Sequence, residues 1–287
     1  MPLTRLITVD GREIPLADVD ITRTVEDFNL PPADVAAVIH DALHNRKEVK
    51  REQITASQAG NGARQLYLEE TIDYATNPQR RIAALRGTMK HALAVAHEGL
   101  RVEERITSNS GSYSAKFDSY VPSTGVLRDA KFPNVFKVIM ILKHGVETQA
   151  RDYVLQLNVT ALILKQQGNT TVNEMWLDFS PSGVGKLEKE ELANKYGIKD
   201  PAFIPVKVPF LPEAEVWNVY ETLMREKAYA HKTETVPGMC TSAQTWGGKK
   251  CQLLPGGDSW CPVASQCHEI AKDRGEVHPR DKQVRVA

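Results

Sequence analysis

One segment in the middle of the chain constrains the fold more than any other. Ser114–Tyr120 reads S-A-K-F-D-S-Y, in which polar and apolar side chains alternate as they do in a strand. Pro122–Gly125 has the composition of a turn, and residues 126–132 (V-L-R-D-A-K-F) then read as a returning strand. The sequence therefore predicts a β-hairpin that places Asp118 and Asp129 on adjacent strands.

This hairpin carries the residue types of a metal-dependent hydrolase. Lys131 shares a strand face with Asp129, because side chains repeat every two residues. Carboxylates bind Mg²⁺ and Mn²⁺, and Mn²⁺ also accepts imidazole nitrogen. We expect Asp118, Asp129, His91 from a helix and the carbonyl of Ala130 to bind the metal, with Lys131 positioning the attacking water. Taken singly, D-x-K is also common on solvated strands, and a lone helical histidine is more often structural.

Four motifs follow one another in a recognisable order. The segment Arg86–His91 (R-G-T-M-K-H) contains a G-x-x-x-H pattern and lies in a predicted helix. Asp118 and then Asp129–Lys131 follow it in the sequence. Gln149–Tyr153 (Q-A-R-D-Y) then opens an apolar helix. In this order the motifs resemble the RecB-like branch of the PD-D/E-x-K nuclease superfamily. The likeness is closest to the iron–sulfur exonucleases of phages and CRISPR systems, over about residues 54–270.

The resemblance implies both a fold and an activity. The implied fold is α/β, with a restriction-endonuclease-like core whose mixed central sheet is flanked by helices, and a cysteine-ligated metal cluster near the C-terminus. The implied activity is a Mg²⁺- or Mn²⁺-dependent DNA exonuclease acting on single strands or duplex ends, in recombination, end processing or CRISPR spacer acquisition. Gln149 and Tyr153 match family residues near the active site. A homo-oligomer or a recombination or CRISPR protein is the implied partner.

The cysteines depart from the family pattern in one respect. Relatives often carry an early cysteine in an S-x-x-x-C-P-R motif, but here Ser57 is followed by Asn61-Gly62 at about that place. The family's final C-x5-C is kept, while the C-x2-C before it is absent. We infer that two further cysteines replace the missing ligands, which gives a set of four, namely Cys240, Cys251, Cys261 and Cys267.

Three interpretations of these cysteines stay open. Four thiolates can hold a 4Fe–4S cluster, which the resemblance favours, or a structural Zn²⁺. Disulfides or free thiols are the third interpretation, and disulfides require an oxidising compartment. The N-terminus, M-P-L-T-R-L, lacks the apolar run of a signal peptide, and no apolar stretch is long enough to span a membrane. We therefore expect a cytoplasmic protein.

The charge balance does not by itself indicate a nucleic-acid-binding protein. The 287 residues include 36 Lys or Arg and 36 Asp or Glu, so the formal net charge is zero. Contacts to DNA must then come from local basic patches. The candidates are His44–Lys47, Lys50–Arg51, and Arg80–Arg81 with Arg86. The alternative function is a non-catalytic DNA-binding or assembly protein that keeps a nuclease fold and a metal cluster.

The chain is expected to comprise four segments: an N-terminal appendage (1–52), a nuclease core (53–235), a four-cysteine region (236–270) and a mobile charged tail (271–287). The appendage should hold a hairpin turning at Asp10-Gly11 and a helix ending at Leu43. Further expected strands are 103–106, 136–142, 172–179 and 204–208, with a lysine-interrupted apolar loop as the alternative for 136–142. Further expected helices are 65–75, 80–100, 149–166 and 212–231.

Overall fold

The computed structural model describes residues 3–44, 52–79, 81, 82, 85, 100–168, 170–246, 248–252 and 259–281. The chain forms two compact units. The first unit comprises residues 1–51, 61–86 and 225–287, and the second comprises residues 52–60 and 87–224. His91 and most of the predicted helix 80–100 lie outside the described residues.

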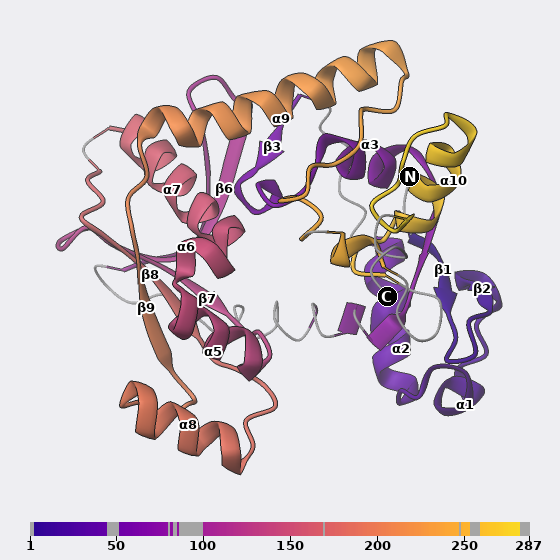
Figure 1. Ribbon diagram of the computed structural model, residues 1–287, viewed down its shortest axis with the longest axis horizontal. Coiled ribbons are helices and arrows are strands. Elements are labelled where there is room, and N and C mark those ends of the chain that lie inside the picture. Colours follow the sequence, from indigo (N-terminus) through magenta and orange to yellow (C-terminus); the bar gives the residue numbers. More distant parts are fainter. Residues whose placement is uncertain are drawn as a thin grey trace. The chain divides into compact units, whose positions relative to one another are not determined.

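A mixed sheet forms the centre of the second unit (Figure 1). Its described strands follow the order β3-β6-β7-β8-β9, and β5 pairs antiparallel with β6 along Ser114–Tyr120, on the edge opposite to β3 and β7. The pairs β6–β7 and β8–β9 are antiparallel, whereas β7–β8 is parallel, which confirms the predicted mixed sheet. The strands are β3 (Ile54–Thr55), β5 (Arg101–Thr107), β6 (Tyr113–Val121), β7 (Val126–Lys131), β8 (Glu174–Phe179) and β9 (Ile204–Val208).

The predicted hairpin is the β6–β7 pair, and its turn occupies residues 122–125 as expected. The backbone N–H of Gly125 donates to the carbonyl of Val121 at 2.8 Å. Gly125 has φ +70°, and a Cβ atom there would lie 2.5 Å from the carbonyl oxygen of Thr171. Both facts require glycine at this position.

Helices join β7 to β8 and cover the sheet, as expected for strands that run in parallel. After β7 come α5 (Val135–His144), α6 (Val146–Gln149) and α7 (Arg151–Gln166), and α7 packs across β5, β6 and β7 (Figure 1). The other described α-helices of this unit are α8 (Lys186–Tyr196) and the first part of α9 (Glu213–Thr233). The boundary between the two units falls within α9, after residue 224.

One prediction for this region was wrong, and another needs a small change. Residues 136–142 were expected to form a strand, but they lie in α5. The Asn134 side chain accepts a hydrogen bond from the backbone N–H of Phe136 at 2.9 Å, which caps the first turn. The predicted helix 149–166 is confirmed as α7, but it begins at Arg151, because Ala150 (φ −144°, ψ 45°) separates α6 from α7.

The first unit contains the predicted N-terminal hairpin within a second sheet of order β2-β1-β4. Its described elements include β1 (Leu3–Ile7), β2 (Glu13–Pro15), β4 (Tyr74–Thr76), α1 (Thr24–Phe28), α2 (Pro32–His44), α3 (Ala63–Thr71), the last part of α9 and α10 (Ala264–Asp273). The hairpin loop is longer than the predicted two-residue turn, since Thr8 donates its N–H to the carbonyl of Arg12 at 2.9 Å. The predicted helix 65–75 ends at Thr71, and its last residues belong to β4.

The expectation of a mobile tail after residue 270 was wrong for residues 271–281. Helix α10 continues to Asp273, and Ala271 and His278 are buried. Glu276 forms an ion pair with Arg64 at 2.6 Å. These contacts hold this stretch on the first unit.

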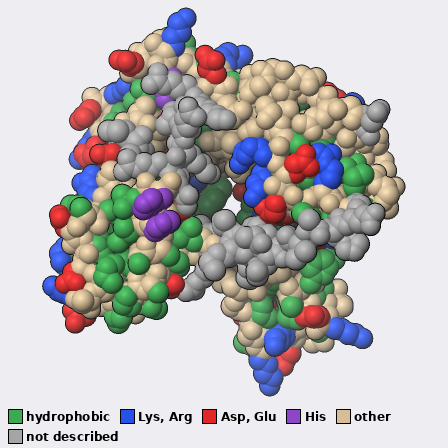
Figure 2. Space-filling view, turned by 180° about the vertical axis from the view of Figure 1, so that it is seen from behind, with side chains coloured by type: hydrophobic (Ala, Val, Ile, Leu, Met, Phe, Trp, Pro, Cys, Tyr) green, Lys and Arg blue, Asp and Glu red, His purple; other side chains and the backbone are tan. Residues whose placement is uncertain are grey.

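Surface charge follows the neutral composition. On the face seen in Figure 2, Lys and Arg side chains are interspersed with Asp and Glu side chains. Within the described part of the chain, no helix is long and apolar enough to cross a membrane.

The turn between β6 and β7 yields a test by substitution. Gly125→Ala should lower the free energy of unfolding more than Gly111→Ala, by at least about 1 kcal/mol. Both glycines have positive φ, but no described atom lies within 4 Å of a Cβ added at Gly111. Urea denaturation of the two variants measures the difference, and equal losses would contradict the close approach at Gly125.

Candidate active site and cysteine pocket

A buried ion pair on β7 forms the centre of the candidate active site. Lys131 Nζ lies 2.5 Å from Asp129 Oδ2, and both side chains are largely buried, with 18% and 5% of their surface exposed. The contact confirms that the two residues share one face of the strand. A buried carboxylate requires such a partner, because an isolated charge is costly away from water.

Helix α7 supplies two side chains to this pair. Lys131 Nζ donates to Gln156 Oε1 at 3.2 Å, and Gln156 Nε2 donates to Asp129 Oδ1 at 3.1 Å. The ammonium also lies 5.0 Å from the centre of the Tyr153 ring, within cation–π range. Tyr153 and Gln156 are three residues apart and therefore on one face of the helix. The pair is thus held from both the sheet and the helix.

These surroundings fix the protonation of Lys131. Burial lowers its pKa, but the charge of Asp129 and the hydrogen bond to it raise the pKa by more, so the net shift is upward. Burial, followed by the charge of Asp152, raises the pKa of Tyr153. Lys131 is therefore an ammonium at neutral pH, suited to stabilise negative charge rather than to act as a base.

Asp118 lies on β6 at the point where its pairing with β7 ends and the two strands diverge. The register of the pair ends at Ser119↔Arg128. The next backbone donor on β7, the N–H of Ala130, is bound by Asp118 Oδ2 at 2.6 Å. Within a strand the N–H and C=O of one residue point to the same side, so the carbonyl of Ala130 also faces β6. The Asp118 carboxylate is thereby fixed beside the residue that follows Asp129.

The donor chemistry of this site suits a hard divalent cation. Asp118 and Asp129 supply carboxylate oxygens, and the Ala130 carbonyl faces the same side. The predicted imidazole ligand, His91, lies outside the described residues. Among the residues that the structure describes, no group of three His, Cys, Asp or Glu side chains meets closely enough to bind one metal ion.

The glutamine next to the pair is not the predicted one. Gln149 ends α6, and its backbone carbonyl accepts a hydrogen bond from Lys137 Nζ. Gln156 contacts both Asp129 and Lys131. A signal for it existed in the sequence, since Gln156 stands one turn after Tyr153 on the face predicted to approach the site.

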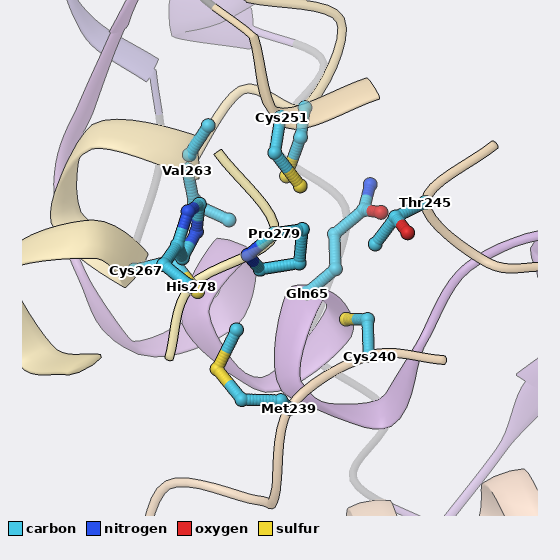
Figure 3. Close-up of a pocket in the computed structure, with 11 residues that line it drawn as sticks. Gln65, Met239, Cys240, Thr245, Cys251, Val263, Cys267, His278 and Pro279 are labelled. Atoms are coloured by element: carbon cyan, nitrogen blue, oxygen red, sulfur yellow. The ribbon is translucent and has the colours of Figure 1, made fainter. Parts of the chain in front are cut away.

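The first unit brings all four cysteines to one pocket (Figure 3). Cys251, Cys261 and Cys267 are buried and Cys240 is half-buried, and all four are free thiols. Figure 3 shows Cys240, Cys251 and Cys267 reaching the pocket from different segments, with Gln65 of α3 between the first two. The sequence prediction had grouped these four residues, but it did not place α3 beside them.

Burial keeps these thiols protonated. It raises the pKa of Cys251 to about 11, with a further contribution from Cys240. Burial likewise raises the pKa values of Cys240, Cys261 and Cys267. A metal that binds here has to displace protons, because thiolates are the ligands.

The donor set fits a thiophilic metal. Four sulfur atoms in one largely buried pocket are the chemistry of a 4Fe–4S or zinc site. Two buried cations accompany the cysteines. Arg64 Nε donates to Cys267 Sγ at 3.1 Å, and Lys250, whose side chain is buried, directly precedes Cys251 in the sequence. In the described parts of the chain, the sulfur atoms do not converge on one coordination point.

No protein-family model and no curated protein matches this sequence. Solved structures that resemble the chain include SSO0001, with a TM-score of 0.42 and 10% identity over 67% of this chain and 84% of that one. An alkaline exonuclease of Laribacter hongkongensis has a TM-score of 0.34 and 13% identity over 64% of this chain and 94% of its own. A phage-related exonuclease of Haemophilus somnus 129PT has a TM-score of 0.31 and 13% identity over 71% and 84%. Two of these are exonucleases, the class named by the sequence resemblance. At these values the likenesses establish neither a family nor an activity.

The buried pair on β7 predicts strong energetic coupling. Lys131→Met leaves the Asp129 charge uncompensated and should lower the free energy of unfolding by about 3–5 kcal/mol. Adding Asp129→Asn should recover part of that loss, with a coupling energy of about 1–3 kcal/mol. Urea denaturation of the wild type, both single variants and the double variant in metal-free buffer completes the cycle. Additive effects would contradict the pairing.

Proposed function

We propose that the chain is a metal-dependent nuclease whose active site is the Asp118, Asp129 and Lys131 group. The observation that carries the proposal is the Asp129–Lys131 pair, with Asp118 fixed beside it across the parting of β6 and β7. Two carboxylates and an ammonium at one point on a sheet are the groups that phosphodiester hydrolysis requires.

Asp118 and Asp129 would hold Mg²⁺ or Mn²⁺, with the Ala130 carbonyl and His91 as the further ligands that the sequence predicts. Such an ion, when bound, polarises the phosphoryl group and makes water a better nucleophile near neutral pH. The two carboxylates are already oriented by hydrogen bonds: the Gln156 side chain donates to Asp129, and the backbone N–H of Ala130 donates to Asp118.

Lys131 supplies the positive charge that the reaction needs. Water adds to phosphorus and the bond to the leaving oxygen breaks, so negative charge builds on the phosphoryl oxygens in the transition state. An ammonium held by Asp129, Gln156 and the Tyr153 ring stabilises that charge without reorganising. Its raised pKa keeps it charged. Lys131 also positions the attacking water by donating a hydrogen bond to it.

The substrate we propose is DNA, taken as single strands or duplex ends by an exonuclease. This follows from the motif order that resembles iron–sulfur exonucleases, and it places the activity in recombination, end processing or CRISPR spacer acquisition. The four-cysteine pocket supports the same proposal. We assign it a 4Fe–4S cluster, with structural Zn²⁺ as the alternative, bound by Cys240, Cys251, Cys261 and Cys267.

Cleavage assays test the active site. Protein purified without oxygen is incubated with end-labelled single- and double-stranded DNA and Mn²⁺ or Mg²⁺. Asp129→Asn and Lys131→Met, each shown by circular dichroism to be folded in the assay, should each lower the cleavage rate by about a hundredfold or more, because each removes a group that acts on the reacting phosphate.

Matched control residues lie on β7 and on the neighbouring strand β8. Arg128 points to the opposite face of β7, where it pairs with Asp178 of β8 at 2.7 Å. Arg128→Met and Asp178→Asn should therefore keep most of the activity. Full cleavage by Lys131→Met, or equal loss in these controls, would contradict the assignment. Absence of cleavage by the wild type on every substrate would favour a non-catalytic DNA-binding role.

Elemental analysis tests the cysteine centre. Cys261→Ser should lose most of the metal that the wild type carries, whereas Met239→Leu should keep it, because Met239 lines the pocket without being a thiolate ligand. Iron with acid-labile sulfide identifies the cluster, and zinc alone identifies the alternative. A wild type that retains neither metal after anaerobic purification would overturn both.

A further inference from the structure

Arg64 is a buried cation next to a cysteine sulfur. Only 1% of the residue is exposed. Its Nε donates to Cys267 Sγ at 3.1 Å, and one terminal nitrogen donates to the Pro237 carbonyl at 3.2 Å and to Glu276 at 2.6 Å. A buried guanidinium is costly unless its donors are satisfied, so this arrangement fixes the position of Cys267.

Gly62 makes room for a second sulfur. A Cβ at Gly62 would lie 2.5 Å from Cys240 Sγ, a distance that two such atoms do not share. The backbone φ at Gly62 is −84°, which any residue adopts, so space alone demands the glycine. Cys240 Sγ also accepts a hydrogen bond from the backbone of Gln65, in the first turn of α3.

The same stretch reaches the remaining two cysteines through one lysine. Asn61 Oδ1 accepts a hydrogen bond from Lys250 Nζ at 2.8 Å, and the Lys250 side chain is buried. Lys250 precedes Cys251 directly, and its carbonyl accepts the backbone N–H of Cys261 at 2.8 Å. Residues 61–65, which supply no cysteine, thus touch or anchor the surroundings of all four sulfur atoms.

We propose that residues 61–65, the sulfur-facing turn, form the outer shell of the four-cysteine metal centre. Arg64 is a positioning residue for Cys267, and Gly62 gives Cys240 the volume that a side chain at position 62 would otherwise fill. The turn holds the centre by N–H···S contacts in place of a ligand of its own. Charge supports this, since four thiolates around a divalent metal or a 4Fe–4S core leave net negative charge that Arg64 and Lys250 offset. The inference rests on the proposed centre.

Cobalt binding tests the role of Arg64. The metal-free protein is titrated with Co²⁺ without oxygen, and the sulfur-to-cobalt absorption reports the ligands. Arg64→Lys keeps the charge but loses the planar fork, so Co²⁺ affinity should fall by about tenfold to a hundredfold and the absorption should shift. Arg274→Lys is the control, because exposed Arg274 donates to the Val236 carbonyl at 3.1 Å rather than to a sulfur atom. An unchanged affinity and spectrum in Arg64→Lys would overturn the role of Arg64.

A transposed cysteine tests the turn even if Arg64→Lys does not fold. Cys240→Ala should weaken Co²⁺ binding and reduce the sulfur-to-cobalt absorption. Adding Gly62→Cys should restore both, because a side chain at position 62 points at the place of the Cys240 sulfur. Failure of this restoration, with the far-ultraviolet circular dichroism of the wild type retained, would overturn the proposal.

The same titration separates this inference from the function on which it rests. If the wild type binds no Co²⁺ through sulfur, the proposed metal centre is contradicted, and the proposed outer shell with it. If the wild type binds Co²⁺, but Arg64→Lys binds it unchanged and Gly62→Cys does not restore binding to Cys240→Ala, only the proposed outer shell is contradicted. DNA cleavage is measured separately and depends on the group around Asp129.

Discussion

The buried Asp129–Lys131 pair is the interaction on which the candidate active site depends. The Asp129 side chain, 5% exposed on a central strand, is stable as a carboxylate only with a partner of opposite charge, and Lys131 provides it at 2.5 Å. The pair in turn requires α7 to pack over β7, since Gln156 completes its hydrogen bonds. It also requires the β6–β7 turn, which brings Asp118 to the parting of the strands. Fold and site are thus fixed by the same contacts.

The cysteine pocket follows a comparable logic in the other unit. Burial raises the pKa values of the four cysteines, so without a metal they stay protonated as thiols. They become thiolate ligands when a metal displaces their protons. Buried Arg64 and Lys250 offset the charge that remains. In the relatives that the sequence resembles, an early cysteine ties the N-terminal part of the domain to the cluster. Here we infer that the sulfur-facing turn does so through hydrogen bonds and close packing.

The sequence predicted the elements whose signals are local. The β6–β7 hairpin combined a period of two with turn residues, and Lys131 followed Asp129 at the spacing that shares a face. The error at 136–142 arose because a short apolar run is compatible with strand or helix, although Asn134 before it and Lys143-His144 after it are helix boundary signals. Gln156 depends on the packing of α7 against β7. Arg64 and Cys267 are 203 residues apart in the sequence, so no local sequence pattern predicts their contact.

Anomalous diffraction from crystals soaked in Mn²⁺ tests the central claim most directly, because it locates the metal independently of any assay. The account predicts one Mn²⁺ peak bound by the carboxylates of Asp118 and Asp129, near Lys131, which disappears in Asp129→Asn crystals. A fully soaked crystal without density between these carboxylates, or with the ion bound elsewhere in the second unit, would contradict a metal-dependent active site at the parting of β6 and β7.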